Sequence, residues 1–286
     1  MRRILALRTL QRGADGRGTV SSSMAAGRRL VPGLLIAVAL LAVAHADEPA
    51  VVPELDRVVV ALALRTDARV GDAMPRIEGL GGRLLALRSY LRSGESLAER
   101  WSWTQERIAA FEGSPEQQEL QAEIRRVREV FERANPGYEL FVNPQVRSLD
   151  IQLVNWNRNE SVAAASTRLL QDAVAHLGAV VGDTATREAS LAAFLKSYTP
   201  EPVPTVAAPG LSPHGQMRAI DFQVHRGAEI VAGPDTQSIV SQWDQGGWSA
   251  RLDSAVREAS RKFIGPLASP REPWHYTYTP VAVAGQ

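Results

Sequence analysis

The spacing of apolar residues changes partway along the chain, at the sequence NPG in positions 135–137. Before this point, at 51–92 and 114–134, apolar residues recur every three or four positions, which is typical of amphipathic helices. After it, "YELFVNPQV" at 138–146 is rich in aromatic and β-branched residues and predicts a strand. A chain with both periodicities in separate stretches is expected to adopt an α+β fold.

The remaining pattern continues this mixture. A turn is expected around Gly71, within the N-terminal helical stretch, and "TPEPVPTVAAPG" at 199–210 excludes regular structure through its prolines and glycine. The other expected elements are helices at 96–111, 161–180, 186–198 and about 249–263, and strands at 218–225 and 274–281. We divide the chain into a helical N-terminal region at 47–113 and a mixed domain at 114–286.

The first 46 residues have the form of a secretory signal peptide. Arg28 and Arg29 precede an apolar run at 30–44 that ends in an Ala-His-Ala exit. This run of about 15 residues is short for a spanning helix, which needs roughly 20, although a retained anchor is the alternative. Residues 1–23 are interpreted as an extension upstream of Met24. We expect a soluble, exported, periplasmic protein with no stable membrane span once residues 1–46 are removed.

Composition excludes several classes of protein. Seven of the 32 basic and one of the 31 acidic residues lie in 1–46, so the remaining chain has 25 basic and 30 acidic residues and a net charge of about −5. This balance predicts no nucleic-acid binding. The absence of cysteine excludes disulfides and thiol nucleophiles. The only lysines, Lys196 and Lys262, have no serine three positions earlier, which excludes the S-x-x-K motif of serine peptidases.

Two short segments contain the residue types of a hydrolytic zinc site. "SPHGQMRAID" contains His214 and Asp221, and "EPWH" contains Glu272 and His275. Such a site needs three ligands from His, Asp or Glu, an open fourth position, and a nearby carboxylate that accepts a proton. The segments therefore predict one Zn²⁺ per chain, with Glu272 as the general base.

Strand alternation supports this interpretation of the second segment. It places Trp274, Tyr276 and Tyr278 on one face, which is expected to be buried, and His275 on the other, facing a cleft. Taken singly, each site residue also has a structural interpretation: a core or surface histidine, an aspartate paired with an arginine, or a solvated glutamate.

Together the two segments resemble the D-alanyl-D-alanine carboxypeptidases of the vancomycin-resistance type. These belong to the zinc peptidases that also include D-Ala-D-Ala dipeptidases and hedgehog-like domains. Their pattern is S-x-H-x-x-G-x-A-x-D followed by E-x-W-H. The resemblance implies a hedgehog/DD-peptidase-like zinc peptidase core at 114–286, with zinc ligands His214, Asp221 and His275 and catalytic Glu272. Met217 stands where the pattern has glycine.

A third segment extends the resemblance. "VNPQVRSLDIQ" is similar to the family's V-x-S-G-Y-R-S-x-x-x-Q stretch, although the S-G-Y is replaced. The similarity implies that Arg147 binds substrate and assists catalysis, with Ser148 and Gln152 as companions. Ser212 and Trp274, from the two zinc segments, are further predicted substrate contacts.

Other conspicuous side chains have structural interpretations. His176 lies in an apolar helical stretch and His225 follows a strand, so both are predicted to be structural. Trp243 and Trp248 could line a groove, but core packing is the favoured role. Arg158 is a second candidate for anion binding.

The resemblance implies a zinc-dependent peptidase that acts on peptidoglycan stem peptides, with release of the terminal D-Ala as the favoured reaction. One alternative is an endopeptidase of the same fold, of the L-Ala-D-Glu type. Another is a catalytically silent module that binds the cell wall or a partner, although a silent module has no need of Glu272. The sequence leaves the oligomeric state open, and residues 47–113 could mediate dimerisation, dock a partner or cap the catalytic core.

Overall fold

The computed structural model describes residues 48–280. The predicted signal peptide and upstream extension, at 1–46, lie outside these residues, as does 281–286. Within the described part, no helix combines the length and the apolar character that crossing a membrane requires.

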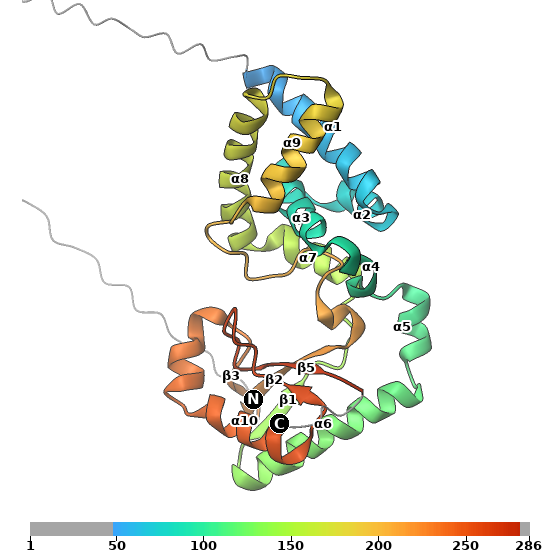
Figure 1. Cartoon of the computed structure of the whole chain (residues 1–286). Coiled ribbons are helices and arrows are strands. Elements are labelled where there is room, and N and C mark those ends of the chain that lie inside the picture. Colours follow the sequence, from blue (N-terminus) through green and yellow to red (C-terminus); the bar gives the residue numbers. More distant parts are fainter. Residues whose placement is uncertain (1–47, 281–286) are drawn as a thin grey trace, which may run out of the picture. The chain divides into compact units, whose positions relative to one another are not determined.

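The described residues form an α+β fold, with helices dominating up to residue 197 and a small antiparallel sheet region after them (Figure 1). The helices are α1 (Glu48–Thr66), α2 (Ala68–Ala73), α3 (Leu80–Ser93), α4 (Leu97–Arg100), α5 (Gln105–Phe111), α6 (Pro115–Ala134), α7 (Leu149–Arg158), α8 (Glu160–Gly178), α9 (Thr184–Ser197) and α10 (Trp248–Ala259). The strands are β1 (Glu139–Val142), β2 (Ala219–Arg226), β3 (Glu229–Ala232), β4 (Phe263–Ile264) and β5 (His275–Tyr278).

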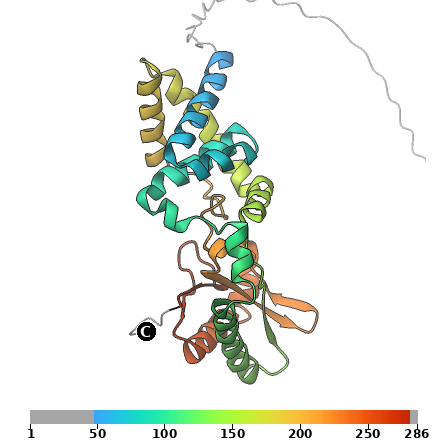
Figure 2. The ribbon, with the colours of Figure 1, turned by 90° about the vertical axis from the view of Figure 1, so that its right-hand side faces the viewer.

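One hydrophobic core is built mainly from helices, which come from two separate parts of the sequence. The helices α1, α3, α8 and α9 pack side by side, as Figure 2 shows from a second direction. Their fully buried side chains include Leu55, Val59, Leu84, Leu87, Leu169, Leu177, Leu191 and Leu195. The N-terminal helices therefore share a core with the helices that follow β1.

The first break in the helical stretch falls at Asp67, and the turn predicted around Gly71 is wrong. The Asp67 side chain caps α2 by accepting a hydrogen bond from the Arg69 N–H at 2.9 Å. Gly71 lies inside α2, where an added Cβ would come within 2.7 Å of Leu64 Cδ2. This glycine therefore permits close packing of α2 on α1.

The second hydrophobic core joins α6 and α10 to the sheet. Ser114 caps α6 as expected, since its Oγ accepts a hydrogen bond from the Gln117 N–H at 3.2 Å. Trp243 and Trp248 are buried in this core, in agreement with the favoured packing role. The indole N–H of Trp243 donates to the Gly233 carbonyl at 2.8 Å, which satisfies its one polar group.

The sheet has the strand order β1-β2-β5-β4, and β3 also pairs with β2. All described pairs are antiparallel. The strand predicted at 138–146 is shorter than expected and ends after Val142. Its ladder stops there because Pro144 has no N–H and the side-chain Oδ1 of Asn143 accepts a hydrogen bond from the Gln145 N–H at 3.0 Å, which forms a tight turn.

The prolines at 199–210 have the predicted effect, because this stretch contains no helix or strand. It leads into a short 3₁₀ helix, η3 (Pro213–Gln216), which carries His214. The chain then enters β2 directly. The loop therefore delivers one of the two predicted zinc segments to the sheet.

Candidate metal centre

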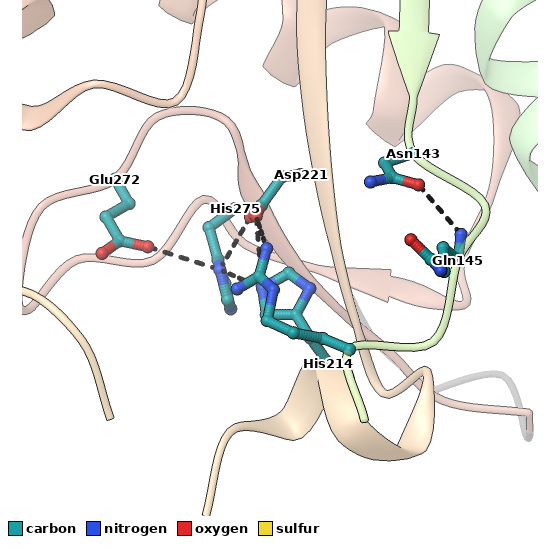
Figure 3. Close-up of polar contacts among 7 residues, drawn as sticks. Asn143, Gln145, His214, Asp221, Glu272 and His275 are labelled. Carbon is teal, nitrogen blue, oxygen red and sulfur yellow. Dashed lines mark hydrogen bonds and ion pairs between the residues drawn. The ribbon is translucent and has the colours of Figure 1, made fainter. Parts of the chain in front are cut away.

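The pairing of β2 with β5 places Asp221 and His275 opposite each other. The Phe222 N–H donates to the Trp274 carbonyl at 3.0 Å, so the next pair along, Asp221 and His275, is a non-hydrogen-bonded pair, in which side chains approach most closely. His275 Nδ1 lies 3.1 Å from Asp221 Oδ1 (Figure 3). Sheet register alone thus joins two residues that are 54 positions apart.

His214 reaches the same point from η3. Its Nε2 lies 3.3 Å from Asp221 Oδ2 and 3.4 Å from His275 Nδ1. The Arg218 N–H donates to the Pro213 carbonyl at 3.0 Å and closes the turn between η3 and β2. Figure 3 shows the two imidazoles and the carboxylate converging from three segments.

This turn depends on Met217, which is left-handed with φ of 51°. Among the described residues it is the one non-glycine residue with a positive φ. A side chain in this conformation costs roughly 1–2 kcal/mol, so the position favours glycine. Met217 is only 4% exposed and packs in the second core, and this burial offsets the strain.

The geometry of these groups fits a metal ion. One ligand atom from each of His214, Asp221 and His275 lies within 4.8 Å of the others. Two ligands of a tetrahedral zinc, each bonded at about 2.0–2.1 Å, are about 3.3–3.4 Å apart. The contacts among the imidazole nitrogens and the carboxylate oxygens, at 3.1–3.4 Å, are of this size, although the two imidazoles contact different oxygens. The site is therefore a His-Asp-His group that could hold a metal ion.

The protonation states suit metal binding. Burial alone would raise the pKa of Asp221, but hydrogen bonds from His214 and His275 outweigh it and hold the pKa well below its usual range. Burial lowers the pKa of His214. Asp221 is therefore charged and His214 favours its neutral form, and these are the forms that coordinate metals.

Glu272 lies beside the three predicted metal ligands and is not itself one of them. Its N–H donates to the Leu267 carbonyl at 2.9 Å, and its carbonyl accepts from the His275 N–H at 3.1 Å, so a tight turn fixes its position before β5. Its Oε2 lies 3.3 Å from His275 Nδ1 (Figure 3). Burial raises the pKa of Glu272, which makes its carboxylate a stronger base.

Arg147 is connected to two of the predicted ligands. Its backbone N–H donates to the His214 carbonyl at 3.2 Å, and its guanidinium donates to Asp221 Oδ2, also at 3.2 Å. A hydrogen bond of this kind orients a ligating carboxylate. The predicted contact between Arg147 and substrate stays a prediction.

Gln152 holds several segments of the site in place. Its Nε2 donates to Ser102 Oγ at 2.6 Å and to the Arg147 carbonyl at 2.7 Å. Its Oε1 accepts from the backbone N–H groups of Gly210 at 2.9 Å and Ser212 at 3.3 Å. Both ends of this buried amide are thus occupied by the protein, so the structure gives Gln152 a positioning role, while its predicted substrate contact stays a prediction.

Gly215 and Gln216 attach η3 to residues 99–103. An added Cβ on Gly215 would lie 2.1 Å from Ser102 Oγ, so only glycine fits there. Gln216 donates from Nε2 to the carbonyls of Glu99 at 2.7 Å and Trp101 at 2.6 Å. These contacts were not predicted, because residues 99–103 contain no motif that associates them with the zinc segments.

The other predicted substrate residues differ in where they lie. Ser148 caps α7, with its Oγ accepting from the Ile151 N–H at 3.5 Å. Ser212 and Trp274 are buried and line the same cavity as the predicted ligands. The ring of Trp274 packs 5.8 Å from that of Trp243. Substrate contact by these three residues stays a prediction.

The predicted ligands open onto a cavity of about 870 Å³. Its lining also includes Arg147, Glu272 and a set of further polar residues. The polar lining residues that the motifs did not predict include Asn155, Asn159, Asp235 and Gln237. Asn155 and Asn159 lie on α7 and directly after it, whereas Asp235 and Gln237 follow β3, and no motif in the sequence associates these two pairs with each other.

The other two histidines among the described residues, predicted to be structural, contact neighbouring side chains. His176 stacks on Phe194 with the ring centroids 4.5 Å apart, and its Nε2 lies 2.9 Å from Ser190 Oγ. His225 Nε2 lies 3.2 Å from Gln223 Oε1. Both rings therefore have partners within the fold.

Comparison of the chain with protein-family models, with curated proteins and with solved structures found no match. The function proposed for the chain therefore rests on its motifs and on the geometry of this site.

Proposed function

We propose that the chain is a zinc-dependent peptidase of the hedgehog/DD-peptidase type that acts on peptidoglycan stem peptides and releases the terminal D-Ala. The observation that carries this proposal is the convergence of His214, Asp221 and His275, with Glu272 beside them, in one cavity. The resemblance of the motifs supplies the substrate class. Export, predicted from residues 1–46, would bring the chain to the compartment that contains peptidoglycan.

The donor set suits zinc in a hydrolytic role. Two imidazoles and one carboxylate leave a fourth position for water or substrate, as catalytic zinc sites do. Zinc held there would polarise a carbonyl and lower the pKa of water from about 15.7 towards about 7. Asp221 supplies the negative charge, and Arg147 orients it.

Glu272 performs the proton transfers in this proposal. Its carboxylate accepts a proton from the attacking water and passes it to the amine that leaves. The raised pKa suits both steps, because a group that titrates nearer to neutral pH can accept a proton and then release it. General acid–base catalysis of this kind contributes roughly 10²- to 10⁴-fold in rate.

Arg147 binds the end of the substrate in this proposal. Only one of its terminal nitrogens donates to Asp221, its side chain is 38% exposed, and it lines the cavity. The remaining N–H groups can bind a carboxylate or an oxygen that gains charge during the reaction. In a carboxypeptidase the carboxylate is that of the terminal D-Ala.

Incubation of the purified protein with a stem pentapeptide, with and without a chelator, tests the proposal by mass spectrometry. We expect loss of one alanine, which stops when the chelator removes the metal and returns when zinc is added. A second pentapeptide with an amidated C-terminus separates the alternatives, because an endopeptidase cuts it and a carboxypeptidase does not. Failure of the zinc-loaded protein to cut either peptide would contradict the proposal and favour a silent module.

A further inference from the structure

One wall of the cavity is formed by α7 and the residue that follows it. Gln152, Asn155 and Asn159 line the cavity and recur at three and four positions, so they share one face of the helical segment. Arg158, in the last turn of α7, lines the cavity with them. The cavity therefore has two guanidinium groups on its lining, those of Arg147 and Arg158.

These two arginines differ in their partners. Arg147 donates to Asp221, whereas the described part of the chain offers Arg158 no ion pair or hydrogen bond of its side chain. Most described arginines have such a partner. The nearby acidic residues do not supply one: Asp235 caps its own turn by accepting from the Gln237 N–H at 3.0 Å, and Glu160 forms no ion pair among the described residues. Arg158 thus presents an exposed positive charge to the cavity.

The distance along α7 between Gln152 and Arg158 indicates how long a ligand must be to reach both arginines. Gln152 donates to the Arg147 carbonyl, so it marks the Arg147 end of the wall. Arg158 lies six residues further on, which is about 9 Å along the helix axis. An extended peptide covers roughly 3.3–3.6 Å per residue, so this distance corresponds to two or three residues. A peptide whose terminal carboxylate lies at Arg147 would place the third or fourth residue from its C-terminus at Arg158.

We infer that Arg158 and Asn155 form a second anion subsite. It binds a carboxylate on the third or fourth residue of the peptide, counted from the C-terminus. This inference rests on the proposed function and specifies it further. The substrate class is a peptide with two carboxylates, one at its end and one on an inner residue. In a peptidoglycan stem the inner carboxylate can be that of a diaminopimelate residue or the α-carboxylate of the γ-linked D-glutamate.

Binding measurements with three stem peptides test the subsite. One peptide carries both inner carboxylates, the second has the diaminopimelate carboxylate amidated, and the third has the glutamate carboxylate amidated. Zinc-loaded protein with Glu272→Gln binds each peptide without cutting it, and calorimetry gives the Kd. We expect one of the two amidations to weaken binding about tenfold, because a hydrogen bond to a charged group is lost.

Variants of Arg158 identify the residue responsible. Arg158→Gln in the Glu272→Gln background is expected to remove the preference for the free carboxylate, and Arg158→Lys to retain part of it, because lysine keeps the charge without the planar fork. Arg125→Gln is the matched control, since Arg125 is exposed on α6 and is not part of the cavity lining. We expect this control to keep the full preference.

The outcomes separate the subsite from the proposed function. Equal binding of the three peptides, or a preference that survives Arg158→Gln, overturns the subsite and leaves the proposed function standing. Absence of binding for every peptide, with zinc loaded, overturns the proposed function and the subsite with it. The subsite is supported if Arg125→Gln keeps the tenfold preference for the free carboxylate and Arg158→Gln loses it.

Discussion

The two halves of the candidate metal centre are positioned by different means. Asp221 and His275 lie on paired strands, where the sheet register alone brings them together. His214 and Arg147 lie outside regular strands and α-helices, on η3 and on the segment before α7. Their backbones are joined directly, by the bond from the Arg147 N–H to the His214 carbonyl. We call the first pair the strand half and the second the loop half.

The loop half depends on contacts that the strand half does not need. Gln152 ties Arg147 and Ser212 to Ser102, and Gln216 holds η3 against the backbone of Glu99 and Trp101. Sheet pairing holds the strand half without such amide contacts. The pairing of β2 with β5 thus fixes two ligands, whereas the position of the third, His214, depends on buried amide side chains and on residues 99–102.

The largest expected effect is the loss of metal when either half loses a ligand. His214→Ala in the loop half and His275→Ala in the strand half should both abolish zinc binding, because two remaining ligands do not make a catalytic site. Elemental analysis of the purified variants measures this. His176→Ala is the matched control and should keep its zinc, since His176 packs on Phe194 away from the cavity lining. Full zinc content in either ligand variant would contradict the site.

The second prediction separates chemistry from metal binding. Glu272→Ala should keep bound zinc and lose roughly 10²- to 10⁴-fold in the rate of stem-peptide hydrolysis, because the proton acceptor is removed and the ligands remain. Zinc content and turnover are measured on the same sample. Glu112→Ala, at an exposed position beyond α5, serves as the control and should retain full rate. A variant of Glu272 with unchanged turnover would exclude its role as the base.

The third prediction addresses the loop half alone. Gln152→Ala removes four hydrogen bonds and leaves buried groups unsatisfied, so it should lower the free energy of unfolding by about 2–4 kcal/mol. Zinc affinity should fall roughly 10- to 100-fold, as for other residues that orient ligands. Urea unfolding and competition with a chelator measure the two effects. Gln118→Ala, exposed on α6, should change neither; equal effects in both variants would mean that the loop half does not depend on Gln152.

The smallest effect is expected from pH. Protons compete with zinc for imidazole nitrogens, so zinc affinity should fall as the pH falls. Burial lowers the pKa of His214 from 6.5, so the neutral form of this ligand persists to lower pH than that of an ordinary histidine. Between pH 7.5 and 6.5 we expect a loss of less than about tenfold, with a steeper fall below that range. A flat affinity profile down to pH 4.5 would argue against ligation by histidine.

The sequence predicted the strand half better than the loop half for a physical reason. Alternation along a strand and the EPWH segment both identify His275, and the pairing of two strands needs only their hydrophobic pattern. His214 was predicted from its motif, but Ser102 was not, because a serine between two tryptophans has no spacing that connects it to residue 152. It was likewise not predicted that α1, α3, α8 and α9 share one core. The spacing of apolar residues identifies the buried face of a helix but not the helix that packs against it.

Local departures from the prediction also have identifiable causes. The break expected at Gly71 occurs at Asp67, where a side-chain cap decides the helix start, and Gly71 instead accommodates Leu64. The early end of β1 follows from the Asn143 turn and Pro144. In each case a single side chain, rather than the averaged pattern of the segment, sets the boundary.

The pairing of β2 with β5 has a consequence for the order of folding and metal binding. His275 follows Asp221 by 54 positions, so a chain emerging from the ribosome carries an incomplete set of ligands until β5 has been synthesised and has docked. The three side chains can therefore share an ion only after β5 has paired with β2. An ion bound by all three side chains would therefore mark a chain in which β5 has paired with β2.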